Sequence, residues 1–128
     1  SKGIDMTGFY MNDGSGLSRS NAITASQLVE VLAYMKLKSK YSKSFLSSLP
    51  VAGKTGTLRS IGKKTKIAGN LKAKSGTMTR IKSYAGYVKS ASGRNLAFAI
   101  VINNHNCTSF EIKKKLEVVM VALGNYDG

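Results

Sequence analysis

Three consecutive segments with strand composition constrain the fold of this chain more than any other feature. They run from Leu71 to Thr79, from Lys82 to Ser90 and from Asn95 to Asn103. Ser92-Gly93 separates the last two segments, which predicts an antiparallel hairpin. The nearly continuous apolar run from Leu96 to Ile102 is typical of a strand that is buried on both faces.

Helix signals precede these strands. Thr24 and Gln27 have the spacing of a capping box, and the apolar residues after them predict a helix of about fifteen residues with one face turned inward. A shorter helix is expected over Tyr41 to Ser48, because Pro50 would stop it. The segment from Lys54 to Asn70 is rich in Gly, Lys and Thr, and we expect it to be irregular.

Another capping box, Thr108 to Glu111, predicts a C-terminal helix that ends at Gly124. Near the other end of the chain, Met6 to Met11 is an apolar stretch with the character of a short strand. The fold class expected is therefore α+β, an antiparallel sheet flanked by helices. The C-terminal helix is expected to face the sheet with Ile112, Leu116, Val119, Met120 and Leu123.

Charge and composition limit the classes of protein to consider. The 128 residues include 20 Lys and Arg against 6 Asp and Glu, a net charge of +14, and no acid lies between Glu30 and Glu111. Such a surface suits nucleic acid or another anionic polymer. The chain has no basic amphipathic helix and no nucleic-acid motif, so a solvated lysine-rich surface is the simpler interpretation. No apolar run is long enough to cross a membrane, and the N-terminus shows no signal peptide.

Residues suited to holding an anionic acyl substrate lie in the first strand segment. Lys74 supplies a positive charge, Ser75 a hydrogen-bond donor, and Gly76 room for the backbone of a ligand. Without a wider context, Lys74 and Ser75 are equally consistent with an exposed edge strand that is protected against strand addition.

The wider context resembles one family. Lys74-Ser75-Gly76 has the form of the third motif of penicillin-binding proteins and serine β-lactamases. Asp13 to Asn21, with the sequence DGSGLSRSN, and Ser48 to Leu58 are similar to segments of the low-molecular-mass class C penicillin-binding proteins, and Tyr84 to Val88 follows in the family's order. The resemblance covers the chain from about Gly8 to the last helix. It implies the fold of the C-terminal part of a penicillin-binding/serine β-lactamase-like domain.

Two motifs of that family are missing. The chain has no Ser-x-Asn, and its single Ser-x-x-Lys, Ser60 to Lys63, lies after the Asp13 segment in a basic loop rather than at the start of a helix. Residues 1–128 are therefore expected to be the C-terminal portion of a transpeptidase-like domain whose nucleophile-bearing part is absent. Lys54-Thr55-Gly56 also spells the third motif, but only Lys74-Ser75-Gly76 precedes the hairpin at the family's spacing.

The resemblance implies a serine-type D-alanyl-D-alanine carboxypeptidase that acts through an acyl-enzyme on peptidoglycan stem peptides, needs no cofactor or metal, and binds β-lactam antibiotics. It implies a catalytic role for Lys74 and substrate binding by Lys74, Ser75, Gly76 and Thr77. The Ser75 and Thr77 hydroxyls would bind the terminal carboxylate, and the Thr77 N–H would form half of the oxyanion hole. It also implies a periplasmic or extracytoplasmic location. The piece alone is expected to be inactive.

Other residues favour structural interpretations. Asp13 to Asn21 is either a plain turn that precedes a helix or a brace for the site. Tyr84 and Tyr87 face opposite sides of a strand, and core packing is expected for at least one of them. His105 has no acid or cysteine pair near it, which disfavours a triad or a metal site. A non-enzymatic basic module that binds nucleic acid or an anionic polymer, and a homologue that has lost its chemistry, remain the alternatives.

Overall fold

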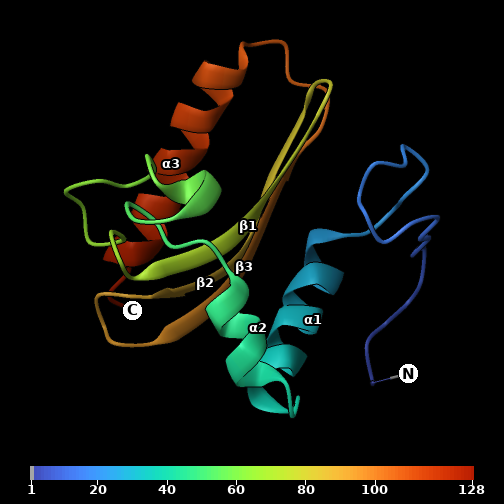
Figure 1. Cartoon of the computed structure of the whole chain (residues 1–128), viewed down its shortest axis with the longest axis horizontal. Coiled ribbons are helices and arrows are strands. Elements are labelled where there is room, and N and C mark those ends of the chain that lie inside the picture. The colour runs from blue at the N-terminus through green and yellow to red at the C-terminus, as the bar shows by residue number, and fades with distance from the viewer. Residues whose placement is uncertain (1) are drawn as a thin grey trace.

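The computed structural model describes residues 2–128 and contains an antiparallel sheet with helices on both faces (Figure 1). The sheet order is β1-β2-β3, so each strand pairs with its neighbour in sequence. This confirms the predicted α+β class. The helices and strands are α1 (Ala25–Leu37), α2 (Ser42–Ser48), the 3-10 helix η1 (Gly56–Leu58), β1 (Leu71–Met78), β2 (Ile81–Lys89), β3 (Asn95–Ile102) and α3 (Ser109–Asn125).

The register of the sheet follows from two tight connections. Arg80, with a φ of 60°, closes the turn between β1 and β2, and Gly93, with a φ of 83°, lies in the predicted turn before β3. Thr77 is thereby paired with Lys82 across β1 and β2. The predicted hairpin of β2 and β3 is confirmed, and each strand bound differs from the prediction by at most one residue.

Both predicted capping boxes are present. The Thr24 side chain accepts from the Gln27 backbone and the Gln27 side chain accepts from the Thr24 backbone, which fixes the start of α1. Thr108 and Glu111 do the same for α3. Each pair satisfies two amide donors that the first turn of a helix leaves unpaired.

The larger hydrophobic core lies between the sheet and α3. Ile112, Leu116 and Met120 of α3 pack on the face of the sheet that carries Tyr84 and Val88. The prediction for Val119 is wrong, because this side chain is 44% exposed. Ile112, Leu116 and Met120 recur every four residues and Leu123 follows, whereas Val119 lies to the side of that stripe.

The segment before β1 is irregular, as predicted, but it belongs to the core. Leu58, Ile61 and Ile67 are completely buried. A Cβ on Gly62 or on Gly124 would lie 2.3 or 2.4 Å from side-chain atoms of Ile67, so both glycines make room for that side chain. The predicted end of the last helix at Gly124 is correct to within one residue, because α3 ends at Asn125. The reason differs: Gly124 lies inside α3, and close packing rather than a C-cap explains the glycine.

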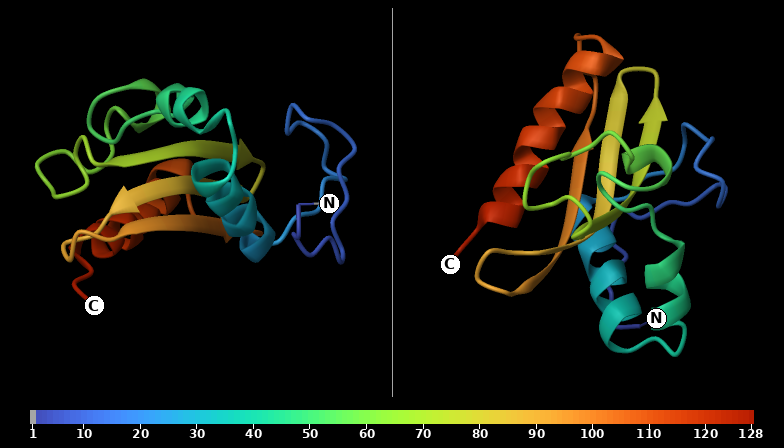
Figure 2. Two further views of the ribbon diagram at one scale, coloured as in Figure 1. Left: turned by 90° about the horizontal axis from the view of Figure 1, so that it is seen from below. Right: turned by 60° about the vertical axis from the view of Figure 1, so that its left-hand side comes forward.

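A smaller core lies on the opposite face, where α1 and α2 cover the sheet (Figure 2). Tyr87 packs there with Leu32 and Leu49, and its hydroxyl donates to the Leu32 carbonyl at 2.6 Å. Tyr84 and Tyr87 are thus both buried on opposite faces, as their spacing predicts.

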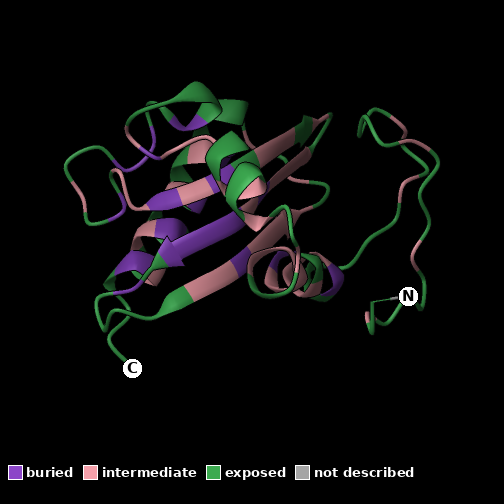
Figure 3. Cartoon of the chain, turned by 60° about the horizontal axis from the view of Figure 1, so that its bottom comes forward, coloured by how far each residue is buried: buried purple, intermediate pink, exposed green. Residues whose placement is uncertain are grey.

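Two further predictions are wrong. Only Phe98 is buried among the β3 residues, because β3 is an edge strand and no further strand in the described chain covers it. Met6 to Met11 forms no strand. Its one bridge joins Tyr10 to Ala22, and residues 2–24 form a mostly exposed segment beside α1 (Figure 3).

Candidate active-site edge

Residues 74 to 77 lie on β1, the edge strand opposite β3. The first half of this edge is occupied: the Ala52 N–H donates to the Leu71 carbonyl at 2.9 Å, and the Ala73 N–H donates to the Pro50 carbonyl at 3.0 Å. Beyond Ala73 the edge is open in the described residues. The four predicted site residues, Lys74, Ser75, Gly76 and Thr77, therefore follow directly where the pairing stops, and none of them is buried.

Backbone direction along this edge follows from strand geometry. The Ala73 N–H points away from β2, and alternate residues of a strand point their N–H and C=O groups to the same side. The N–H groups of Ser75 and Thr77 therefore point outward. The Thr77 N–H lies where an incoming carbonyl oxygen could accept from it.

Side chains of the predicted site divide between the two faces of the sheet. Ser75 and Thr77 share the parity of Ala73, which is in the α3-side core, whereas Lys74 projects to the α1 side. The Lys74 ammonium reaches back to the edge and donates to the Ser75 carbonyl at 3.2 Å. The Lys74 ammonium and the hydroxyls of Ser75 and Thr77 thus lie along the same edge of the sheet, although their side chains leave the strand on opposite faces.

Gly76 has a steric reason to be glycine. A Cβ at this position would lie 2.5 Å from the Ser83 hydroxyl on the neighbouring strand. A larger residue would displace either Ser83 or the strand. The edge at Gly76 stays flat and leaves space for a ligand backbone on the α1 side.

The Ser75 hydroxyl connects the edge to the turn before it. It donates to the Thr57 hydroxyl in η1 at 3.0 Å. The second triplet, Lys54-Thr55-Gly56, lies in that same turn: the Thr55 hydroxyl accepts from the Val51 N–H, and Gly56 has a φ of +53°. Lys74-Ser75-Gly76 is therefore the triplet on a strand, and the other one shapes the turn that faces it.

Lys82 joins the site although the sequence did not single it out. Its ammonium donates to the Thr77 hydroxyl at 2.6 Å, and it lies 5.2 Å from the centroid of the Tyr84 ring. Burial lowers the pKa of Lys82, and the positive charges of Lys113 and Lys74 lower it further. Lys82 can be recognised as a site residue only from the strand register, which pairs it with Thr77.

The single Ser-x-x-Lys match does not form a nucleophile motif. Ser60 lies in a turn, Ile61 is buried in the core, and the ammonium beside the Ser60 hydroxyl, at 2.7 Å, is that of Lys113 on α3. A nucleophile motif of this type opens a helix so that Ser and Lys share one face. This observation agrees with the interpretation of Ser60 as a loop residue.

Asp13 organises the N-terminal segment. Its carboxylate accepts from the Ser15 hydroxyl at 2.7 Å and from the Asn21 side-chain amide at 2.8 Å, and also from the Gly16 and Ser18 backbones. The hydrogen bonds from Ser15 and Asn21 hold its pKa below the ordinary value. These contacts favour the plain-turn interpretation, because every partner lies within the segment.

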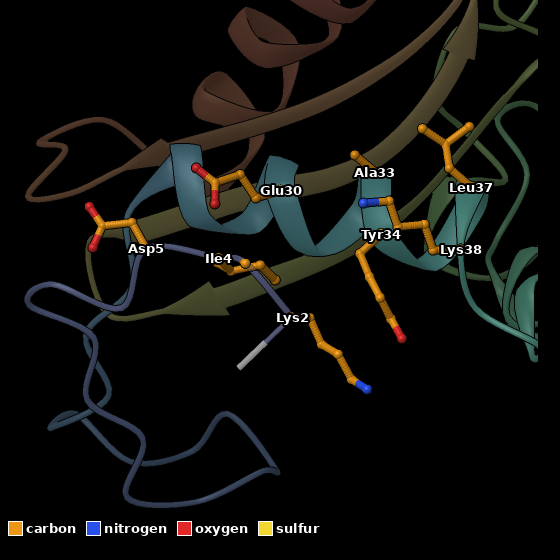
Figure 4. A pocket seen from close by; sticks show the side chains of 9 residues that line it. Lys2, Ile4, Asp5, Glu30, Ala33, Tyr34, Leu37 and Lys38 are labelled. Carbon is orange, nitrogen blue, oxygen red and sulfur yellow. The ribbon is translucent and has the colours of Figure 1, made fainter.

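His105 and a cleft beside α1 lie outside this edge. His105 Nδ1 is 3.0 Å from the Cys107 carbonyl, and the described residues place no group of three His, Cys, Asp or Glu together for a metal ion. A cleft of about 430 Å³ separates residues 2–5 from α1 (Figure 4). Asp5, Glu30 and Lys38 line it with mixed charge, and its lining residues include no serine, threonine, cysteine or histidine. The chemistry of the β1 edge therefore makes it the better candidate site.

Known proteins resemble this chain over most of its length. The model of the D-Ala-D-Ala carboxypeptidase 3 (S13) family matches residues 1–123. The D-alanyl-D-alanine carboxypeptidase of Actinomadura sp. (strain R39) is 39% identical over 109 residues, which are 81% of this chain and 20% of that protein. Carboxypeptidase DacB of Mycolicibacterium smegmatis is 36% identical over 129 residues, 97% of this chain and 28% of that protein.

Solved structures share the fold. Penicillin-binding protein 4 of Haemophilus influenzae, in complex with a β-lactam, has a TM-score of 0.85 and 26% identity over 98% of this chain and 30% of that chain. The chain thus spans less than a third of the length of these three proteins. No helix among the described residues is long and apolar enough to cross a membrane.

Proposed function

Because the chain belongs to the D-Ala-D-Ala carboxypeptidase 3 (S13) family, we propose that it is the C-terminal part of a serine-type D-alanyl-D-alanine carboxypeptidase. The substrate is a peptidoglycan stem peptide that ends in D-Ala-D-Ala. A serine outside this chain attacks the carbonyl carbon of the penultimate residue, the terminal D-alanine leaves as its amine takes up a proton, and water then hydrolyses the acyl-enzyme ester.

The open half of β1 is the observation that carries this proposal. It presents an ammonium, two hydroxyls and outward-pointing N–H groups within four consecutive residues, directly beyond the point where pairing with Pro50 and Ala52 stops. An extended peptide can add to such an edge as a further strand. The family's activity requires that geometry, because the scissile amide must be held in one orientation against the nucleophile.

Each residue of the edge then has a role. Thr77 donates its backbone N–H to the oxyanion of the tetrahedral intermediate, and the other donor comes from the nucleophile-bearing part. Removing one such donor typically costs about 2.7–4 kcal/mol. Ser75 and Thr77 bind the substrate carboxylate through their hydroxyls. Lys74 keeps the potential of the site positive and assists proton transfer, and Gly76 lets the substrate backbone approach.

The same site is proposed to react with β-lactam antibiotics, which Haemophilus influenzae penicillin-binding protein 4 binds in its solved complex. A substrate in the cell wall requires an extracytoplasmic enzyme, so the proposed location is the periplasm or the cell surface. The mechanism uses side-chain and backbone groups only, and needs no metal or organic cofactor.

A fluorescent penicillin tests the proposal. The 128-residue chain alone is expected to remain unlabelled, because Ser60 is the only Ser-x-x-Lys serine and it pairs with Lys113 in a turn. The full-length protein is expected to be labelled and to release D-alanine from a D-Ala-D-Ala peptide. Stable labelling of the isolated chain would contradict the proposed division of the site, and an inert full-length protein would instead support a homologue that has lost its chemistry.

The net charge of +14 supports a second candidate function, a basic module that binds nucleic acid or an anionic polymer. Few of the basic side chains have an acidic partner: the described residues contain one salt bridge, Lys114 with Glu117. Binding of this kind weakens steeply with salt. An affinity for single-stranded or duplex nucleic acid that depends on salt but is unchanged in a Ser75→Ala variant would favour this alternative over the enzyme.

A further inference from the structure

We propose that Lys82 is a specificity-determining residue, whose ammonium forms the ion pair with the terminal carboxylate of the substrate when that carboxylate is bound at Thr77. The inference rests on the proposed function of the β1 edge and extends it to the neighbouring strand. In this arrangement, Lys82 on β2 recognises the negative charge of the carboxylate, and the hydroxyls of β1 fix the position of the carboxylate by hydrogen bonds.

The position of Lys82 follows from the sheet. Thr77 and Lys82 are partners in the antiparallel register of β1 and β2, so their side chains leave the sheet on the same face. The ammonium lies 2.6 Å from the Thr77 hydroxyl oxygen. A carboxylate that accepts a hydrogen bond from the Thr77 hydroxyl is therefore also within reach of the Lys82 ammonium.

The ammonium of Lys82 has no carboxylate partner in residues 2–128. Lys74 and Lys113 are the charged groups that act on it, and both are positive. The two acids of the facing helix are engaged elsewhere. Glu111 accepts from the Thr108 N–H and hydroxyl at 2.8 Å, and Glu117 accepts from the Gly62 N–H at 2.8 Å and lies 3.5 Å from the Lys114 ammonium. Lys113 is itself held by the Ser60 hydroxyl.

This arrangement favours an anion over a neutral group. Three positive charges around one partly buried position repel one another, and burial weakens the screening by water. Both effects lower the pKa of Lys82. A bound carboxylate would relieve the repulsion and replace the water lost by the ammonium, whereas a neutral ester or amide would supply no charge. The site should therefore prefer substrates with a free C-terminal carboxylate.

The test compares substrates with and without that charge in the full-length protein. Hydrolysis of a D-Ala-D-Ala peptide is measured beside its C-terminal methyl ester, and acylation by benzylpenicillin beside its methyl ester. Lys82→Met keeps the length of the side chain and removes the charge, and Lys82→Arg keeps the charge. Lys89→Met is the matched control, because Lys89 lies at the far end of the same strand and is exposed.

Lys82→Met is expected to lower kcat/KM for the free acid by about ten- to a hundredfold, the loss of one charge-assisted hydrogen bond. The methyl ester should change by less than about threefold, Lys82→Arg should retain most of the preference for the acid, and Lys89→Met should match the wild type. An equal loss for acid and ester would overturn the assignment, as would an unchanged preference. An inactive wild type would instead refute the proposed function, and thermal unfolding of each variant identifies a folding defect.

Discussion

The hydroxyl of Tyr87 offers a direct test of how α1 is held on the sheet. It is buried and donates to the Leu32 carbonyl in the middle of α1 at 2.6 Å. Tyr87→Phe removes this one hydrogen bond and leaves the ring in place, including its contact with the Lys36 ammonium, 5.2 Å from the ring centroid. Any loss of stability then reports on the hydroxyl alone.

The expected loss of stability depends on whether the Leu32 carbonyl keeps another hydrogen bond in Tyr87→Phe. The Leu32 carbonyl lies within α1, where the regular helical pattern provides the Lys36 N–H as a second donor. The Leu32 carbonyl therefore keeps a hydrogen-bond donor when the hydroxyl is removed. The free energy of unfolding should fall by the net value of one hydrogen bond, about 1 kcal/mol, rather than by the larger penalty of an unpaired buried acceptor. For a chain of this length, that corresponds to a decrease in Tm of about 4 °C.

Tyr84→Phe is the matched control. Tyr84 is equally buried, on the same strand and on the opposite face, but its hydroxyl has no protein hydrogen-bond partner within residues 2–128. This variant should differ from the wild type by less than about 0.5 kcal/mol. Urea unfolding followed by circular dichroism measures both variants. An equal loss of stability in the two variants would refute the proposed role of the Tyr87 hydroxyl. Removal of any buried hydroxyl would then explain the loss, and the hydrogen bond to α1 would not.

Three further predictions concern the site, the sheet and pH. Lys74→Ala should lower hydrolysis of a D-Ala-D-Ala peptide by the full-length protein by about 10²–10³-fold without a change in Tm, since Lys74 is exposed; full activity would exclude the proposed role. Gly86→Ala should destabilise the chain by about 3 kcal/mol or more, measured by urea unfolding, because the new Cβ would lie 2.0 Å from the Lys72 carbonyl oxygen on β1. Burial raises the pKa of both Tyr84 and Tyr87, so the unfolded chain loses these protons first and stability should fall as the pH rises above about 10. A chain with both tyrosines replaced by phenylalanine should show less of that alkaline loss, and an identical pH profile would contradict the assignment.

Sequence signals predicted the helices and strands correctly where the structural feature depends only on residues close together in the sequence. A capping box consists of two residues three positions apart, so Thr24 with Gln27 and Thr108 with Glu111 specify helix starts without tertiary information. The hairpin turn at Gly93 is local in the same sense. These features fixed the class of fold and the order of the elements.

Features that depend on tertiary contacts were not predictable. Leu58, Ile61 and Ile67 have neither helical nor strand periodicity, so nothing in their spacing indicated that they complete the core beneath α3. Gly124 illustrates the difficulty: a glycine near the end of a helix usually marks a C-cap. Here it accommodates the side chain of Ile67, more than fifty residues away in sequence.

The part of the candidate site that consists of consecutive residues could be predicted from the sequence. Lys74 to Thr77 were predicted as site residues from their order, and the structure places them on an open edge. Lys82 could not be identified in this way, because its significance depends on the register that pairs it with Thr77. Knowing the length of the β1 to β2 turn in advance would have been sufficient to find it.

The division of the site between two faces constrains how a substrate can bind. Lys74 projects toward the α1 side, whereas the hydroxyls of Ser75 and Thr77 project toward the α3 side. A ligand confined to one face would reach only part of this set. A peptide extended along the edge can reach all of it, because it pairs with the outward backbone groups and places successive substituents on alternate sides. A substrate that binds along β1 as an added strand can therefore use both Lys74 and Thr77.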